Sequence, residues 1–125
     1  MALLGRVLDK LGQPPEITRA LNLRNWTESV PGITPIVKLE PRCPGRAAGV
    51  VHNIRIDPRQ GTGSIEAAII DGTGELTARW LGRASLQGVR LGIGLVLQGI
   101  VGLDQDGGLV ILNPEYELVS GPEHH

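Results

Sequence analysis

Hydrophobic and polar residues alternate along the middle of the chain with the period of two that is typical of a β-strand. The runs 64–70 and 75–81 follow this period, and the residues between them read Asp-Gly-Thr-Gly, which favours a hairpin turn. Pairing the two runs places one set of residues on the same face: Ile65, Ala67, Ile69, Leu76, Ala78 and Trp80. The other face then carries Glu66, Ala68, Ile70, Thr77 and Arg79. We expect the first face to line the core and the second to point outward.

Three further segments predict the rest of the sheet. The run 46–57 is rich in Val and Ile, and Gly49 within it suits a bulge or a sharp coil in a long first strand. The run 95–103 is almost wholly apolar and predicts a buried fourth strand. Residues 109–112 and 116–119 predict a fifth strand that is broken or bent at the proline between them.

The number of strands decides between two all-β architectures. The segment 82–92 lacks clear alternation, and we expect a helical turn around 84–87 within it. Five strands, a helical segment between the third and the fourth, and glycine-marked bends are typical of an open Greek-key barrel. Most sandwiches need more strands than this. The pattern therefore predicts an all-β, five-stranded Greek-key barrel.

The first part of the chain predicts helix followed by linker. Residues 2–11 carry apolar residues at helical spacing, which indicates a short amphipathic helix. Residues 16–26 can add one or two further helical turns before prolines and a glycine mark a linker. The chain therefore divides into an N-terminal helical extension and linker (1–33), a barrel (34–120) and a flexible tail (121–125).

Composition and charge narrow the classes of function. The length of 125 residues suits one domain, and 41% hydrophobic with 20% charged residues is typical of a soluble globular protein. Charged residues interrupt the apolar N-terminal pattern too early for a signal peptide or a membrane span, so we expect a cytoplasmic protein without membrane contact. The formal net charge of -1 gives no overall attraction to nucleic acid, but the segment 42–90 holds seven Arg against four acidic residues. One part of the barrel is therefore expected to be locally basic.

Residues that often carry catalysis or hold metals are few and isolated. Cys43 is the single cysteine, so it cannot form an internal disulfide or a cysteine-rich metal site. His52 is the only histidine in the body of the chain and has no second histidine at metal-binding spacing. The turn 71–74 resembles the Asp-Thr-Gly loop of aspartic proteases, but an extra glycine separates Asp71 from Thr73, and a hairpin turn fits better. We therefore expect no enzymatic activity, no cofactor and no bound metal.

The stretch from Gly49 to Trp80, which contains GVVHNIRID and IEAAIIDGTGELTARW, resembles the OB-fold nucleic-acid-binding family. It is similar to the anticodon-binding domain of class II aminoacyl-tRNA synthetases and to OB domains of DNA replication and repair proteins. The longer span from Thr34 to Leu118, including TPIVKLEP, WLGR and NPEYEL, resembles small bacterial stand-alone OB-fold proteins that bind nucleic acid. The resemblance implies a five-stranded OB-fold barrel behind the short helical extension.

The resemblance also implies where a ligand binds. In OB folds that bind nucleic acid, the ligand usually crosses the second and third strands, where aromatic side chains stack on bases and Arg contacts phosphates. Carried onto this sequence, that region offers a set of candidate residues: Arg79, Arg83, Thr77, Arg55, Arg59 and His52. Glu66 stands where synthetase domains often present a stacking aromatic, so we expect binding to depend mainly on phosphate contacts. Trp80 is expected in the core, with base stacking as its alternative role.

Two functions remain open from the sequence. The first is a module that binds single-stranded DNA or RNA through the arginines of this face. The second is a protein-interaction or assembly module, which forms a homodimer or binds a larger partner without binding nucleic acid. Near-neutral charge, few aromatics, an outward Ile70 and the apolar N-terminal helix favour this alternative.

Overall fold

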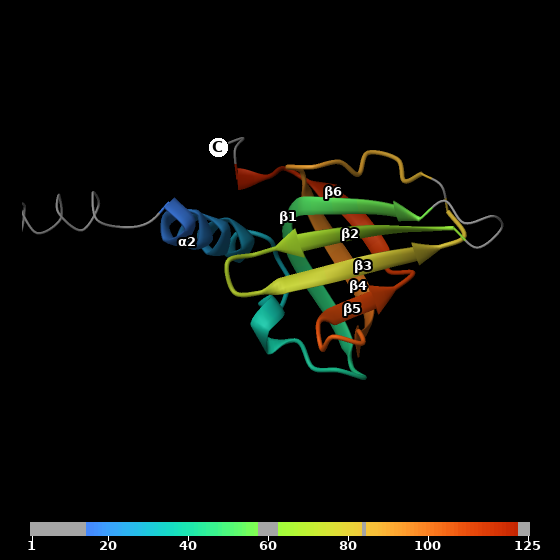
Figure 1. Ribbon diagram of the computed structural model, residues 1–125. Coiled ribbons are helices and arrows are strands. Elements are labelled where there is room, and N and C mark those ends of the chain that lie inside the picture. Colours follow the sequence, from blue (N-terminus) through green and yellow to red (C-terminus); the bar gives the residue numbers. More distant parts are fainter. Residues whose placement is uncertain (1–14, 58–62, 84, 123–125) are drawn as a thin grey trace, which may run out of the picture.

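The computed structural model of the chain describes residues 15–57, 63–83 and 85–122. Its elements follow one another in the order α2 (Pro15–Glu28), η1 (Ile36–Lys38), β1 (Pro44–Asp57), β2 (Ser64–Ile70), β3 (Glu75–Leu81), β4 (Gly94–Leu103), β5 (Leu109–Leu112) and β6 (Glu115–Val119) (Figure 1). The predicted helix over 2–11, the candidate residue Arg59 and the end of the predicted tail lie outside the described residues. Within the described part of the chain, no helix has the length and apolar character needed to cross a membrane.

The strands close into a barrel. β1 pairs antiparallel with β4 along its first half and with β2 along its second half. β2 pairs antiparallel with β3, β3 pairs parallel with β5, and β5 pairs antiparallel with β4, which completes a ring of strands. β6 also pairs with β4, alongside the part of β4 that β5 does not reach. The predicted Greek-key barrel is therefore confirmed.

The strand boundaries agree closely with the hydrophobic pattern. β2 and β3 occupy the predicted runs 64–70 and 75–81. β5 and β6 are the two halves of the predicted fifth strand, separated at Asn113 and Pro114. Asn113 adopts a φ of 49°, in the left-handed region that asparagine tolerates better than most residues. The break predicted at the proline is therefore confirmed.

The segment between β3 and β4 differs from the prediction. Its described residues, 85–93, form turns and contain no helix, so the helical turn expected around 84–87 is wrong for them. Gly82, Gly88 and Gly92 adopt φ angles of 72°, 80° and 87°. A residue in the left-handed region ends a helix instead of continuing it. These glycines therefore make the connection a series of turns, and Leu86, Val89 and Ile93 within it pack against the barrel core.

Gly49 lies where β1 passes from its pairing with β4 to its pairing with β2. A Cβ atom at this position would lie 2.7 Å from the carbonyl oxygen of Ile70, so only glycine allows the two backbones to approach this closely. A register shift between Val51 and Asn53 follows directly. The predicted coil in the first strand is confirmed, and it allows one strand to pair with both of its neighbours in the ring.

The barrel interior is filled mainly by aliphatic side chains. Every residue predicted on the inner face of the hairpin is buried: Ile65, Ala67, Ile69, Leu76, Ala78 and Trp80. Trp80 Nε1 donates a hydrogen bond of 3.0 Å to the carbonyl oxygen of Pro114. Its ring meets the ring of Tyr116 edge to face, with 5.5 Å between the centroids. Trp80 is therefore a core residue, as predicted, and is not available to stack on a base.

Helix α2 packs against the outside of the barrel through Trp26. This side chain is 4% exposed and forms a second apolar cluster with Ala48 and Val96. Its Nε1 donates a hydrogen bond of 2.8 Å to the carbonyl oxygen of Ser120, close to the end of the described chain. Figure 1 shows the helix at the end of the barrel where the β2–β3 turn lies. The part of the N-terminal extension that the structure describes is therefore in contact with the barrel.

Asp71 joins the β2–β3 turn to η1. Its side chain is 1% exposed, and its Oδ2 accepts a hydrogen bond of 2.9 Å from the backbone N–H of Ile36. Its Oδ1 accepts hydrogen bonds from the backbone N–H and the hydroxyl of Thr73 and from the backbone N–H of Gly74. The Asp-Gly-Thr-Gly segment is therefore the predicted turn and also the attachment point for the chain before β1, which is a structural role.

Candidate nucleic-acid interface

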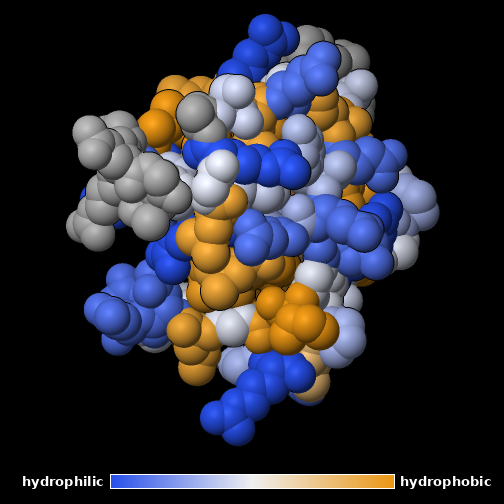
Figure 2. All heavy atoms as spheres, turned by 90° about the vertical axis from the view of Figure 1, so that its right-hand side faces the viewer, coloured by the Kyte–Doolittle hydropathy of each residue, from blue (hydrophilic) through white to orange (hydrophobic). Residues whose placement is uncertain are grey.

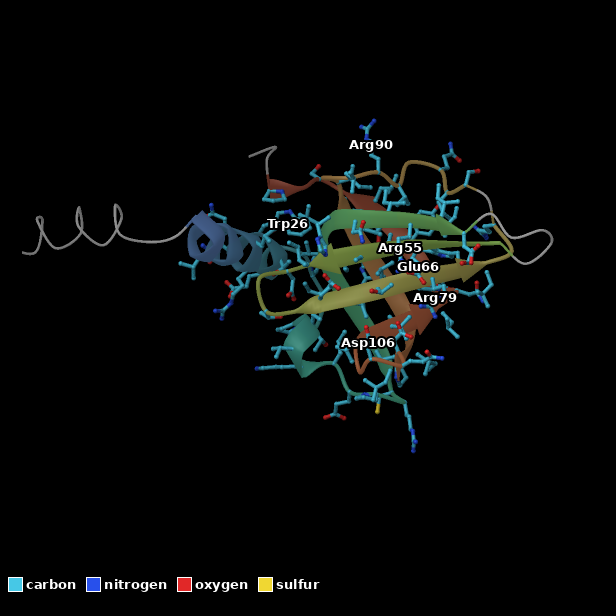
Figure 3. The ribbon with its side chains drawn as sticks, viewed as in Figure 1. Trp26, Arg55, Glu66, Arg79, Arg90 and Asp106 are labelled. Carbon is cyan, nitrogen blue, oxygen red and sulfur yellow. The ribbon has the colours of Figure 1, made fainter. Side chains whose placement is uncertain are left out.

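The outer face of β1, β2 and β3 carries a row of charged side chains, which we call the charged row: Arg55, Glu66 and Arg79. Arg55 of β1 lies opposite Glu66 of β2, and Glu66 lies opposite Arg79 of β3. Figure 3 shows the three residues one after another across the strands. The charges alternate in sign along the row. The face predicted to be lined by arginine is therefore mixed in charge.

Arg79 is paired with two carboxylates. Its Nε donates a hydrogen bond of 2.6 Å to Glu66 Oε1, and its Nη2 lies 3.5 Å from Asp104 Oδ2. The side chains of Arg79 and Glu66 are 26% and 21% exposed, so the pair is partly removed from water. The hydrogen bond to Glu66 outweighs desolvation and, with the charges of both carboxylates, raises the pKa of Arg79 above its ordinary value. Arg79 stays charged, but its two acidic partners compete with any phosphate.

Arg55 is the cation of the charged row that has no partner among the residues that the structure describes. It is exposed and makes no hydrogen bond or ion pair with the described residues. Together with Ile56, Asp57, Ser64 and Glu66 it lines a pocket of about 350 Å³ on the outside of the β1–β2 pair. The pocket is therefore lined by the guanidinium of Arg55 and the carboxylate of Glu66, which lie on neighbouring strands.

The other predicted residues lie around the charged row. Thr77 is half-buried on β3 and shares the outer face with Arg79. His52 is exposed on β1, and its Nε2 lies 2.6 Å from Glu75 Oε2. Arg83 is exposed just beyond the end of β3. The structure therefore brings Thr77 together with the two arginines of the charged row, and it places His52 and Arg83 at the margins of the face.

No Trp or Tyr side chain lies on this face. The chain has two Trp, one Tyr and no Phe. Trp80 and Tyr116 pack against each other at the barrel core, and Trp26 of α2 is buried against Ala48 and Val96 of the barrel. A nucleic acid on this face therefore has no such ring to stack on, and its binding depends on charge and hydrogen bonds.

Two acidic residues were not identified from the sequence as partners of Arg79. Glu66 and Arg79 are equally distant from the centre of the turn 71–74, so the predicted hairpin already places them opposite one another. The register alone could therefore have identified this pair. Asp104 comes from the loop between β4 and β5, and no local pattern connects it with β3.

The outer surface also has an apolar row across β3, β5 and β4, consisting of Leu81, Leu112 and Ile100. Their side chains are 51%, 54% and 60% exposed. Leu112 pairs in register with Arg79, and the β4–β5 register continues from Val101 toward Ile100. Figure 2 shows apolar surface gathered among polar side chains at the end of the barrel that contains the ends of β3 and β5. Apolar side chains exposed together are typical of a contact surface.

This chain is similar to known proteins in structure but has no match by sequence. No family model matches the sequence, and no curated protein matches it significantly. The replication factor A related protein from Methanobacterium thermoautotrophicum aligns with a TM-score of 0.55 and 22% identity, over 70% of this chain and 90% of that chain. RecG bound to a three-way DNA junction aligns with a TM-score of 0.61 and 20% identity, over 92% of this chain.

The alignment with RecG extends beyond the barrel. Residues from Thr34 onward make up less than three quarters of this chain, so a match over 92% includes residues of α2. The match spans only 18% of the RecG chain. Both similarities concern the fold, and together with the closed ring of strands they show that this chain has an OB fold.

Proposed function

We propose that this chain is a nucleic-acid-binding OB module, without catalytic activity, that contacts single-stranded DNA or RNA through the outer face of β1, β2 and β3. The observation that carries the proposal is the exposed guanidinium of Arg55, which has no acidic partner among the described residues and lies on the face that OB folds use for oligonucleotides. The related folds support the proposal, because one is a replication factor A related protein and the other was solved on a DNA junction.

Arg55 and Arg79 have different roles in this proposal. Arg55 offers planar N–H donors to a phosphate without giving up a hydrogen bond to any described residue. Arg79 reaches a phosphate only if it exchanges Glu66 or Asp104 for it. Without an aromatic platform and with few free cations, the face binds a single strand weakly and depends strongly on Arg55.

Binding of a labelled single-stranded oligonucleotide, followed by fluorescence anisotropy at about 50 and about 200 mM salt, tests the proposal. We expect affinity to fall as salt rises, and Arg55→Ala to reduce the slope of log affinity against log salt by about 0.7, the value for one phosphate contact to a single strand. Arg90→Ala is the matched control, because it removes the same charge from an exposed position away from the charged row (Figure 3).

Two results would contradict the proposal. Binding that does not respond to salt would show that phosphates are not contacted. Equal losses in Arg55→Ala and Arg90→Ala would show that the outer face of β1, β2 and β3 is not the interface.

The apolar row supports a second candidate function, a module for protein interaction or self-assembly. Leu81, Leu112 and Ile100 expose large apolar side chains on neighbouring strands, and removing this surface from water would stabilise a complex with a partner that covers it. Light scattering over a concentration series distinguishes self-assembly from a monomer of 13.3 kDa. A dimer that dissociates in Leu112→Ser favours this function, whereas a monomer at every concentration counts against self-assembly.

A further inference from the structure

We infer that the pocket beside Arg55 binds one guanine base and that Glu66 is the residue that selects it. The inference rests on the proposed function, because it concerns what the same face recognises. The pocket measures about 350 Å³, and its lining includes a cation, carboxylates and a hydroxyl. Its volume lies at the small end of the range of roughly 300–1,000 Å³ that ligand pockets span, and its lining suits a polar ring.

Glu66 is oriented by Arg79. Its Oε1 accepts the 2.6 Å hydrogen bond from Arg79 Nε, and no described residue donates a hydrogen bond to its Oε2. The Glu66 side chain is only 21% exposed, and it lines the pocket. Arg79 is therefore a positioning residue in this proposal. It holds a carboxylate at the pocket, and this role explains why the cation on β3 is not left free for phosphate.

The chemistry of a carboxylate favours guanine. An ionised carboxylate accepts hydrogen bonds and donates none, so it selects base edges that carry N–H groups. Guanine presents two adjacent N–H groups, at N1 and N2, on its Watson–Crick edge. Adenine and cytosine present an amino group beside an acceptor nitrogen, and thymine and uracil present one N–H between two carbonyl oxygens. These acceptors repel a carboxylate, so guanine is the best complement to Glu66.

Arg55 supplies the other half of the recognition. It lies opposite Glu66 in the β1–β2 pair and has no partner among the described residues. A guanidinium pairs well with O6 and N7 of guanine, and O6 is next to N1–H. The charged row therefore presents a donor and an acceptor side by side, as the edges of guanine require. The alternating charges of the row weaken phosphate binding, but they provide the donor and the acceptor that recognition of a base requires.

Removing one amino group from the base of the ligand tests this inference. The probe is a short labelled oligothymidylate with one central dG, compared with the same oligonucleotide carrying deoxyinosine at that position. Hypoxanthine keeps N1–H, O6 and N7 of guanine and lacks the N2 amino group, so the comparison isolates one hydrogen bond to the carboxylate. We expect the natural protein to bind the dG oligonucleotide about tenfold more tightly, as fits a hydrogen bond to a charged group.

Glu66→Gln provides the second arm of the test. Glutamine keeps the size of the side chain but presents a donor as well as an acceptor, so the ratio of the two affinities should fall close to unity. Glu115→Gln makes the same chemical change at an exposed position on β6 and should keep the ratio of the natural protein. Because the ratio compares two ligands on one protein, a general change in charge or folded fraction cancels.

The outcomes separate this inference from the proposed function. A tenfold preference that is lost in Glu66→Gln and kept in Glu115→Gln supports the guanine pocket. Equal affinities for the two oligonucleotides overturn it while leaving nucleic-acid binding intact. An unchanged preference in Glu66→Gln overturns the role of Glu66. Failure to bind either oligonucleotide overturns the proposed function and the inference together.

Discussion

Arg79 donates a 2.6 Å hydrogen bond from its Nε to Oε1 of Glu66, directly across the β2–β3 pair. Hydrogen bonds between ionised groups are roughly twice as strong as neutral ones, and this pair is partly shielded from water. Asp104 adds a second carboxylate from the β4–β5 loop. The outer face of β1, β2 and β3 is therefore built around an internal ion pair, and the proposed interface depends on how that pair is arranged.

Release of Arg79 from Asp104 is expected to strengthen phosphate binding. Asp104→Asn removes the carboxylate that lies 3.5 Å from Arg79 Nη2, and we expect oligonucleotide affinity at low salt to rise by about threefold, or about 0.6 kcal/mol. Asp106→Asn is the matched control, because it removes the same charge from the same loop, where Asp106 contacts Gly108 and not Arg79. Fluorescence anisotropy measures both variants. An equal rise in affinity in the two variants would mean that the net charge of the loop, and not the contact between Asp104 and Arg79, determines oligonucleotide binding.

Asp71→Asn is expected to lower the free energy of unfolding by about 1–3 kcal/mol. The amide nitrogen of asparagine cannot accept the hydrogen bonds that one of the buried carboxylate oxygens now accepts, so either the N–H of Ile36 or the turn is left unsatisfied. Urea denaturation measures the change, with the exposed Asp106→Asn as a control that should stay within about 0.5 kcal/mol of the natural protein. Faster hydrogen exchange at the Ile36 amide would show that the loss of stability comes from the hydrogen bond to η1. An unchanged free energy of unfolding would show that this attachment does not stabilise the fold.

The local pattern of hydrophobic and polar residues was sufficient to predict the barrel. Period-two alternation placed Ile65, Ile69, Leu76 and Trp80 in the core because one side of a closed sheet faces the interior and a shift of one residue would expose the entire set. The break near Pro114 and the coil near Gly49 were predictable because each depends on a single residue with restricted or unusual backbone geometry. The helical turn predicted after β3 was wrong for the described residues, because the left-handed glycines on both sides of it favour turns.

The site was harder to predict than the fold. The residue type made Arg55 and Arg79 equally good candidates, yet of these two arginines only Arg55 is unpaired among the described residues. The difference is partly long-range: Asp104 reaches Arg79 through the β4–β5 loop, and loop conformation leaves no periodic trace in the sequence. Glu66 was noted only as the replacement for an aromatic, although hairpin register already placed it beside Arg79.

Trp26→Ala is expected to lower the free energy of unfolding by about 3–5 kcal/mol, because it leaves a cavity between α2 and the barrel. Trp26→Phe should cost less, since it keeps most of the packing and loses the hydrogen bond to the Ser120 carbonyl. Urea denaturation gives both values. Leu21→Ala changes a 43% exposed residue on the same helix and should cost far less than Trp26→Ala. Similar losses in free energy of unfolding at the two positions would mean that the contact between Trp26 and the barrel does not determine the effect.

Gly49→Ala is expected to destabilise the barrel by about 1–3 kcal/mol, the usual cost of forcing an extra methyl group into a packed site. The added Cβ would lie 2.7 Å from the carbonyl oxygen of Ile70 and 3.0 Å from Cβ of Ile69, and a backbone contact of this kind cannot be relieved by rotating a side chain. Gly102→Ala on β4 is the matched control, since its nearest atom is 3.6 Å away. There the substitution should be neutral or stabilise by about 0.5 kcal/mol, because alanine loses less entropy than glycine in a strand. Thermal unfolding of the two variants in parallel measures the contrast, and equal melting temperatures would show that β1 can pass between its neighbours without the close approach at Gly49.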